Sequence, residues 1–177
     1  MCFSNGNFRR ALILGGARSG KSRFAEEMVR QTGLPRVYIA TAQAFDGEMA
    51  ARIAMHREDR GPDWETLEAP EALAATLAEV EPGRAVLVDC LTLWLSNLML
   101  AGRDIAAGTE ALLAVLAEVP GPVVLVSNEL GMGLVPETAL GRTFRDAQGR
   151  LNQQVAAAAD RVVFVAAGLP LVLKGGG

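Results

Sequence analysis

The chain has 177 residues, 50% of them hydrophobic and 21% charged, so we expect one globular domain over residues 1–177, with 1–9 and 175–177 as flexible ends. Its net charge of −3 provides no overall basic surface for nucleic acid. Two cysteines, Cys2 and Cys90, are too few for a disulfide framework. The chain shows neither a signal-peptide pattern nor an apolar run long enough to span a membrane. We therefore expect a cytoplasmic protein.

Short apolar runs alternate with helical patterns along the chain. The runs predict strands at Ala11–Leu14, Val37–Ala40, Ala85–Val88, Val123–Ser127, Val162–Ala166 and Leu169–Leu173. The helical patterns cover Lys21–Gln31, Gly47–Arg60, Pro70–Glu81, Asp104–Glu118 and Thr138–Asp160, and Leu91–Leu100 is an apolar helix for the core or a subunit interface. The first five runs are continuously apolar, which is typical of parallel strands that are buried on both faces. Only Ala167-Gly168 separates the last two, which predicts an antiparallel hairpin.

The segment GGARSGKS, Gly15 to Ser22, lies between the first predicted strand and the first predicted helix. It matches the pattern G-x-x-x-x-G-K-[ST], whose backbone N–H groups surround the phosphates of a bound nucleotide. The expected phosphate contacts come from the whole segment: Gly15, Gly16, Ala17, Arg18, Ser19, Gly20, Lys21 and Ser22. Lys21 would reach the β- and γ-phosphates, and the Ser22 hydroxyl could ligate Mg²⁺. A three-layer α/β P-loop NTPase of the RecA-like type is the predicted fold.

Asp89 directly follows the predicted strand Ala85–Val88. An acid at the carboxyl end of a buried strand is the usual partner of the Mg²⁺ that a phosphate loop holds, and ligands bind at this edge of open α/β sheets. The competing interpretation is an acid that caps a turn. Asn128–Gly133 follows another strand toward the same edge, and it is either a glycine-rich turn or a contact for a ligand.

His56 is the only histidine of the chain. On the predicted helix Gly47–Arg60 it shares a face with Ile53 and Arg60, and Arg52 lies at the edge of that face. A single histidine on an apolar helix face is usually just packed. Among arginines and near a phosphate loop, its imidazole could instead attack phosphorus as a nucleophile.

Six stretches together give the chain a resemblance to a known family. They are GGARSGKSRFAE (15–26), YIATAQAFDGEMAARIAMHREDR (38–60), WETLEAP (64–70), VLVDCLTLWLSN (86–97), VVLVSNELGMGLVPE (123–137) and FRDAQGRLNQQVAAAADRVVFV (144–165). With these motifs the chain resembles the bifunctional adenosylcobinamide kinase / adenosylcobinamide-phosphate guanylyltransferase family of cobalamin biosynthesis.

The resemblance implies two reactions. A nucleoside triphosphate, ATP or GTP, phosphorylates adenosylcobinamide; GTP then guanylylates a histidine, and the GMP moves to adenosylcobinamide phosphate to give adenosylcobinamide-GDP. The guanylylated histidine falls on His56. The resemblance further implies nucleotide contacts from Thr41, Ala42, Gln43, Arg57, Glu58, Asp59, Arg60, Glu68 and Asp89. It also implies a homo-oligomer, which we expect to be a trimer.

Three other functions compete with this interpretation. A P-loop metabolite kinase without guanylyltransferase activity needs the loop but not His56. A GTP-dependent switch would need N-K-x-D after a strand, where the chain has Ser127-Asn128-Glu129-Leu130. A RecA-like motor would want a basic track for nucleic acid. The sequence identifies no general base for the kinase step, although Asp89 and Glu68 are candidates.

Overall fold

A central seven-stranded sheet organises the part of the chain that the computed structural model describes, residues 8–43 and 61–176. The strands are β1 (Arg10–Gly15), β2 (Arg36–Ala40), β3 (Trp64–Glu68), β4 (Ala85–Asp89), β5 (Val123–Asn128), β6 (Arg161–Ala166) and β7 (Leu169–Lys174). The helices are α1 (Lys21–Arg30), α3 (Leu73–Ala78), α4 (Leu91–Leu100), α5 (Ile105–Glu118) and α6 (Ala139–Ala158). The spatial order of the strands is β3-β2-β4-β5-β1-β6-β7, and all neighbours are parallel except β6 and β7.

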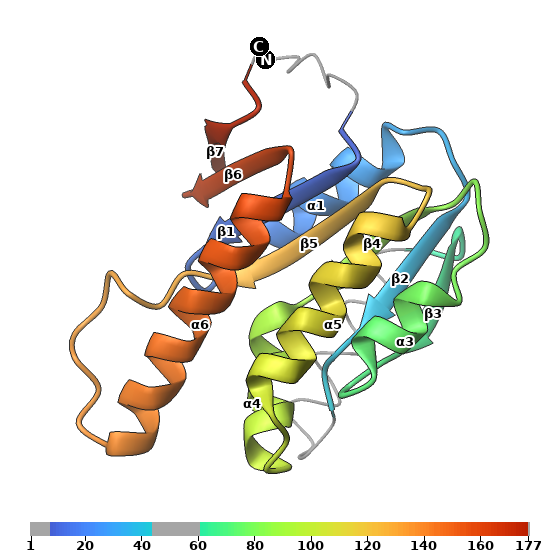
Figure 1. The fold of residues 1–177 in the computed structure, drawn as a ribbon. Helices are drawn as coiled ribbons and strands as arrows, with labels where there is room; N and C mark the ends of the chain where they lie inside the picture. Colours follow the sequence, from blue (N-terminus) through green and yellow to red (C-terminus); the bar gives the residue numbers. More distant parts are fainter. Residues whose placement is uncertain (1–7, 44–60, 177) are drawn as a thin grey trace.

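Both faces of the sheet are buried, which explains the continuously apolar strands. Successive side chains of β1 point to opposite faces, so Leu12 packs with α3, α4, α5 and α6 while Ile13 packs with α1. In Figure 1, α1 lies behind the sheet, and α3, α4, α5 and α6 lie in front of it. The predicted three-layer α/β arrangement with a mostly parallel sheet is confirmed.

The elements agree with the sequence-based prediction in most places and differ in two. The Leu91–Leu100 helix is observed with the predicted bounds, whereas Pro70–Glu81 contains a helix only over Leu73–Ala78. The edge strand β3 was not predicted, because its sequence WETLE has polar residues at three of five positions and lacks an apolar run. The predicted helix Gly47–Arg60 lies outside the described residues.

The hairpin of β6 and β7 is observed as predicted. Its two turn residues, Ala167 and Gly168, both have positive φ (51° and 77°), the geometry that two-residue hairpin turns favour. The Gly168 N–H donates to Ser19 O at 2.8 Å. The hairpin turn is therefore hydrogen-bonded to the phosphate loop.

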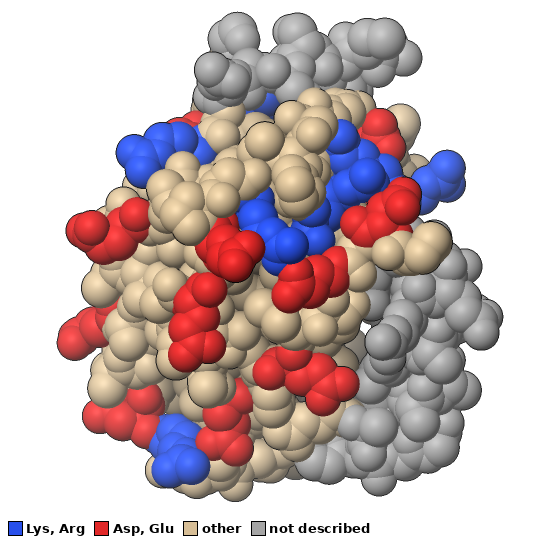
Figure 2. Space-filling view, turned by 90° about the vertical axis from the view of Figure 1, so that its right-hand side faces the viewer, with Lys and Arg blue, Asp and Glu red and all other residues tan. Residues whose placement is uncertain are grey.

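Figure 2 faces the β3 side of the molecule, where arginine side chains (blue) and carboxylates (red) adjoin one another. Arg84 forms an ion pair with Glu65 of β3, and Arg36 Nη2 lies 3.9 Å from Asp63 Oδ2. Opposed charges along an edge strand discourage pairing with a strand of another molecule. Within the described ranges, no helix is both long and apolar enough to cross a bilayer.

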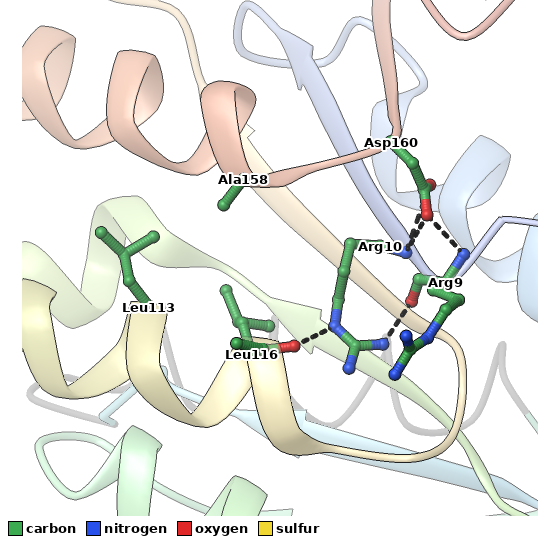
Figure 3. A pocket seen from close by; sticks show the side chains of 7 residues that line it. Arg9, Arg10, Leu113, Leu116, Ala158 and Asp160 are labelled. Carbon is green, nitrogen blue, oxygen red and sulfur yellow. Dashed lines mark hydrogen bonds between the residues drawn. The ribbon is translucent and has the colours of Figure 1, made fainter.

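A cavity of about 340 Å³ lies where β1 begins, at the sheet edge opposite to Gly15 (Figure 3). Arg10 lines it and donates to the carbonyl oxygens of Leu116, Val119 and Gly121 at the end of α5. Burial lowers the pKa of Arg10, Arg9 lowers it further and Asp160 opposes them. Because backbone carbonyl groups already accept hydrogen bonds from this guanidinium, we infer that Arg10 holds α5 on the sheet and does not bind an anion.

Candidate nucleotide-binding site

Five parallel strands bring the predicted site residues to one edge of the sheet. Ala40 of β2 is in register with Asp89 of β4 on one side and with Glu68 of β3 on the other. Gly15 of β1 is in register with Asn128 of β5. Since β5 lies between β4 and β1, Asn128 ends its strand between Asp89 and the phosphate loop.

The phosphate loop turns tightly at its two outer glycines. A Cβ at Gly15 would lie 2.5 Å from both Ser19 Oγ and Val165 O, so no side chain fits there. Gly20 has φ 92° and lies so close to Gly168 that a Cβ would be 3.2 Å from its Cα. Both positions require glycine, and the pattern of the loop follows from this packing.

Within the loop, Lys21 folds back over the backbone. Its Nζ donates to Gly16 O at 3.1 Å, and the Phe24 N–H donates to Gly20 O at 3.0 Å as α1 begins. The exposed Ala17 and Arg18 and the half-buried Ser22 present the N-terminal end of α1 to solvent. The unpaired N–H groups and the positive end of the dipole at such a terminus suit phosphate.

Asp89 and Lys21 both act electrostatically on Cys90. Burial raises the pKa of the Cys90 thiol to about 11; Asp89 adds to this effect and Lys21 opposes it. The carboxylate that ends β4 and the ammonium of the loop therefore lie within electrostatic reach of one point. A thiol with this pKa stays protonated at neutral pH, which argues against Cys90 as a nucleophile.

Thr41 is completely buried, and its hydroxyl already forms two hydrogen bonds. Its Oγ1 donates to Cys90 O at 2.7 Å and accepts from Cys90 N at 2.8 Å, and its carbonyl accepts from Asn97 Nδ2 at 2.8 Å. We therefore assign Thr41 to holding the end of β4, next to Asp89. The half-buried Ala42 and Gln43 follow it at the same edge, and Glu68 is exposed at the end of β3.

The residues for a magnesium ion are present. Mg²⁺ is usually held by one or two carboxylates together with the phosphates of its substrate and several waters. No cluster of three or more His, Cys, Asp or Glu side chains forms a metal cage in the described ranges, and a nucleotide-bound Mg²⁺ needs none. The half-buried Ser22 hydroxyl and Asp89 carboxylate are hard oxygen donors of the right kind.

The structure thus brings Gly15–Ser22, Thr41–Gln43, Asp89 and Glu68 to one edge. His56 and the following Arg57, Glu58, Asp59 and Arg60 lie outside the described residues. Sequence reasoning missed Thr92 and Asn152, whose side chains bond the backbone of Asn128. Both lie in stretches that carry the family resemblance, but only the folded arrangement of α4 and α6 around β5 reveals their contacts with Asn128.

Comparison with known proteins gave matches over nearly the whole chain. The sequence model of the cobinamide kinase / cobinamide phosphate guanyltransferase family matches residues 11–173. The bifunctional adenosylcobalamin biosynthesis protein CobP of Pseudomonas aeruginosa is 56% identical over 169 residues, which are 94% of this chain and 98% of that protein. The bifunctional adenosylcobalamin biosynthesis protein CobU of Escherichia coli is 42% identical over 179 residues, with coverages of 92% and 98%.

Solved structures with a similar fold are more distant in sequence. The flagellar accessory protein FlaH of Methanocaldococcus jannaschii superposes with a TM-score of 0.54 at 12% identity, over 99% of this chain and 84% of that one. The RadB recombinase gives a TM-score of 0.50 at 15% identity, with coverages of 92% and 77%. These two likenesses concern the RecA-like fold alone.

Proposed function

Because this chain belongs to the cobinamide kinase / cobinamide phosphate guanyltransferase family, we propose how its residues share the two activities of that family. The protein is a bifunctional enzyme of adenosylcobalamin biosynthesis, a cobinamide kinase and a cobinamide-phosphate guanylyltransferase. One observation carries the assignment of residues: the phosphate loop, with Lys21 folded over it, and Asp89 lie at the same sheet edge.

In the kinase step, Gly15–Ser22 holds the triphosphate of ATP or GTP. The hydroxyl of the aminopropanol arm of adenosylcobinamide attacks the γ-phosphorus and loses its proton to solvent. The bond between the γ-phosphorus and the bridging oxygen breaks, and a nucleoside diphosphate leaves. Lys21 and the loop N–H groups stabilise the negative charge that moves onto the leaving group. Positioning and charge neutralisation supply most of the catalysis of such transfers.

In the guanylyltransferase step, His56 attacks the α-phosphorus of GTP. The bond between the α-phosphorus and the bridging oxygen breaks, pyrophosphate leaves, and GMP stays on an imidazole nitrogen. A phosphate oxygen of adenosylcobinamide phosphate then attacks the same phosphorus and releases the histidine. This covalent route divides one difficult transfer into two easier ones. It is supported by the family resemblance of the 38–60 stretch and by His56 being the only histidine of the chain.

The remaining polar residues of the site bind the nucleotide in this proposal. An arginine among Arg52, Arg57 and Arg60 neutralises the α-phosphate, because a guanidinium pairs bidentately with phosphate oxygens. Ala42, Gln43, Glu58, Asp59 and Glu68 line the nucleotide. Thr41 contributes through the strand end that it supports.

We assign Mg²⁺ to Ser22 and Asp89. The ion would supply positive charge at the β- and γ-phosphate oxygens. The Ser22 hydroxyl and the Asp89 carboxylate would hold it, and Asp89 would orient it relative to Lys21.

The assembly and the compartment are also proposals. The resemblance points to a homo-oligomer, and we propose a trimer. Reactions that use ATP, GTP and a corrinoid intermediate fit the cytoplasm, where nucleoside triphosphates are available.

The two activities are tested by supplying the two nucleotides separately and together. The purified protein is incubated with cobinamide, Mg²⁺ and ATP, GTP or both, and the masses of the corrinoid products are measured by mass spectrometry. We expect cobinamide phosphate with at least one triphosphate and cobinamide-GDP only with GTP. If cobinamide is phosphorylated but no cobinamide-GDP forms in the presence of both nucleotides, the protein is a metabolite kinase without guanylyltransferase activity.

A further inference from the structure

Asn128, the last residue of β5, has its backbone fixed from three directions. Its N–H donates to Thr92 Oγ1 at 2.8 Å, and its carbonyl accepts from Asn152 Nδ2 at 3.0 Å. The next N–H, that of Glu129, donates to Gly15 O at 3.2 Å. The end of β5 is therefore held firmly beside the first residue of the phosphate loop.

The alternation of side chains along β5 places Asn128 on the face that carries α1. Val124 and Val126 pack in the cluster that contains Met28 of α1, whereas Ser127 turns to α6 and donates to Asn152 Oδ1 at 2.7 Å. Asp89 follows Leu87 of the same α1-side cluster. Asp89, Asn128 and the phosphate loop thus lie on one face of neighbouring strands.

No hydrogen bond to the described residues fixes the carboxamide of Asn128. Asn128 Oδ1 is buried and forms no hydrogen bond within the described part of the chain. The amide of Asn152, by contrast, is locked, because its Oδ1 accepts from both Ser127 Oγ and Gln148 Nε2. Nothing in the described residues therefore holds this carboxamide in one orientation, and a rotation would exchange the places of Oδ1 and Nδ2.

We propose that the side chain of Asn128 contacts the terminal phosphate of the bound triphosphate and donates to it from Nδ2. Turning this carboxamide toward a ligand costs no hydrogen bond to the described residues. Its place between Asp89 and the loop corresponds to the β- and γ-phosphates, which Lys21 would contact and whose charge an Mg²⁺ held by Asp89 would help to neutralise. Asn128 thereby distinguishes a triphosphate from a diphosphate.

This inference rests on the proposed function, since it assumes that the loop holds a nucleoside triphosphate. The test uses the full-length protein and two probes: the α,β-methylene analogue of GTP, which cannot release pyrophosphate, and the α,β-methylene analogue of GDP. Affinities for both are measured by calorimetry with Mg²⁺. The variants are Asn128→Ala and Asn128→Asp; Ser127→Ala, whose side chain lies on the opposite face, is the matched control.

We expect Asn128→Ala to weaken binding of the triphosphate on the order of 10- to 100-fold, the effect of a hydrogen bond to a charged group, and to leave diphosphate binding within about twofold. Asn128→Asp should weaken triphosphate binding further, because a carboxylate repels the terminal phosphate. Ser127→Ala lowers the melting temperature and keeps the wild-type ratio of the two affinities.

An unchanged ratio in Asn128→Ala overturns the inference, whether or not that variant is less stable. If the wild-type protein binds neither probe, the proposed function fails as well. If the wild type binds the triphosphate and makes both corrinoid products while Asn128→Ala keeps the ratio, only the role of Asn128 fails.

Discussion

Thr41 and Cys90 hold each other through a reciprocal pair of hydrogen bonds. The Thr41 hydroxyl donates to the carbonyl of Cys90 and accepts from its N–H, at 2.7 and 2.8 Å. Both residues are buried, and each follows directly after a strand, β2 or β4. The pair fixes the chain next to Asp89, so Thr41 serves the site by supporting it.

Replacing Thr41 by valine should destabilise the protein. The variant keeps the volume of the side chain but leaves two buried backbone groups of Cys90 without partners, which should lower the free energy of unfolding by about 2–4 kcal/mol. Urea unfolding measures the change. Thr41→Ser retains the hydroxyl and should lose about 1 kcal/mol; equal losses in both variants would show that the hydroxyl is not what matters.

Lys21 should be required for both reactions. Lys21→Ala removes the ammonium that stabilises the leaving phosphate and should lower both rates on the order of 100- to 1,000-fold. Lys21→Arg should not restore them, because a planar guanidinium replaces a compact charge. Steady-state assays with cobinamide and with cobinamide phosphate report the two rates.

The only other lysine offers a control for this prediction. Lys174 in β7 donates to the carbonyls of Ala156 and Ala157, at 3.0 Å each. Lys174→Ala should therefore leave both reactions at the wild-type rate. Full activity of Lys21→Ala would disprove the assignment of the phosphate loop.

The buried Cys90 thiol should make stability fall in alkaline solution. Its pKa is raised to about 11 from an ordinary value of 9.0, chiefly by burial. Between these pH values the unfolded chain loses the thiol proton while the folded chain keeps it, so the free energy of unfolding should fall by about 2–3 kcal/mol. Urea unfolding of wild type and Cys90→Ala between pH 8 and 11 isolates this contribution, which the variant should lack. Parallel pH dependences would contradict it.

Arg10 should matter for stability and not for chemistry. Arg10→Lys loses most of the hydrogen bonds to the carbonyls at the end of α5 and should cost about 2–4 kcal/mol. Since Arg10 lies at the edge opposite to the loop, kcat at 25 °C should not change. Arg9→Ala, which removes an exposed neighbouring side chain, is the control. A loss of kcat in the folded Arg10→Lys protein would contradict this role.

Much of the fold could be predicted because its signals are local. Fully buried parallel strands such as β4 and β5 must be apolar on both faces, and the phosphate loop needs glycine where Gly15 and Gly20 approach other backbone. The edge strand β3 escaped because three of its five residues are polar and it has no apolar run. The supporting roles of Thr41, Thr92 and Asn152 also escaped, since a hydroxyl or carboxamide acquires its partner only when distant elements pack together.

The most direct test of the account is covalent labelling by GTP. The purified protein is incubated with Mg²⁺ and GTP labelled on the α-phosphate, in parallel with γ-labelled GTP, and then denatured. The account predicts an acid-labile, alkali-stable label on the protein from the α-phosphate alone, and its absence in His56→Asn. If GTP binds and neither position labels the protein, or if His56→Asn is labelled as strongly as wild type, His56 is not the nucleophile.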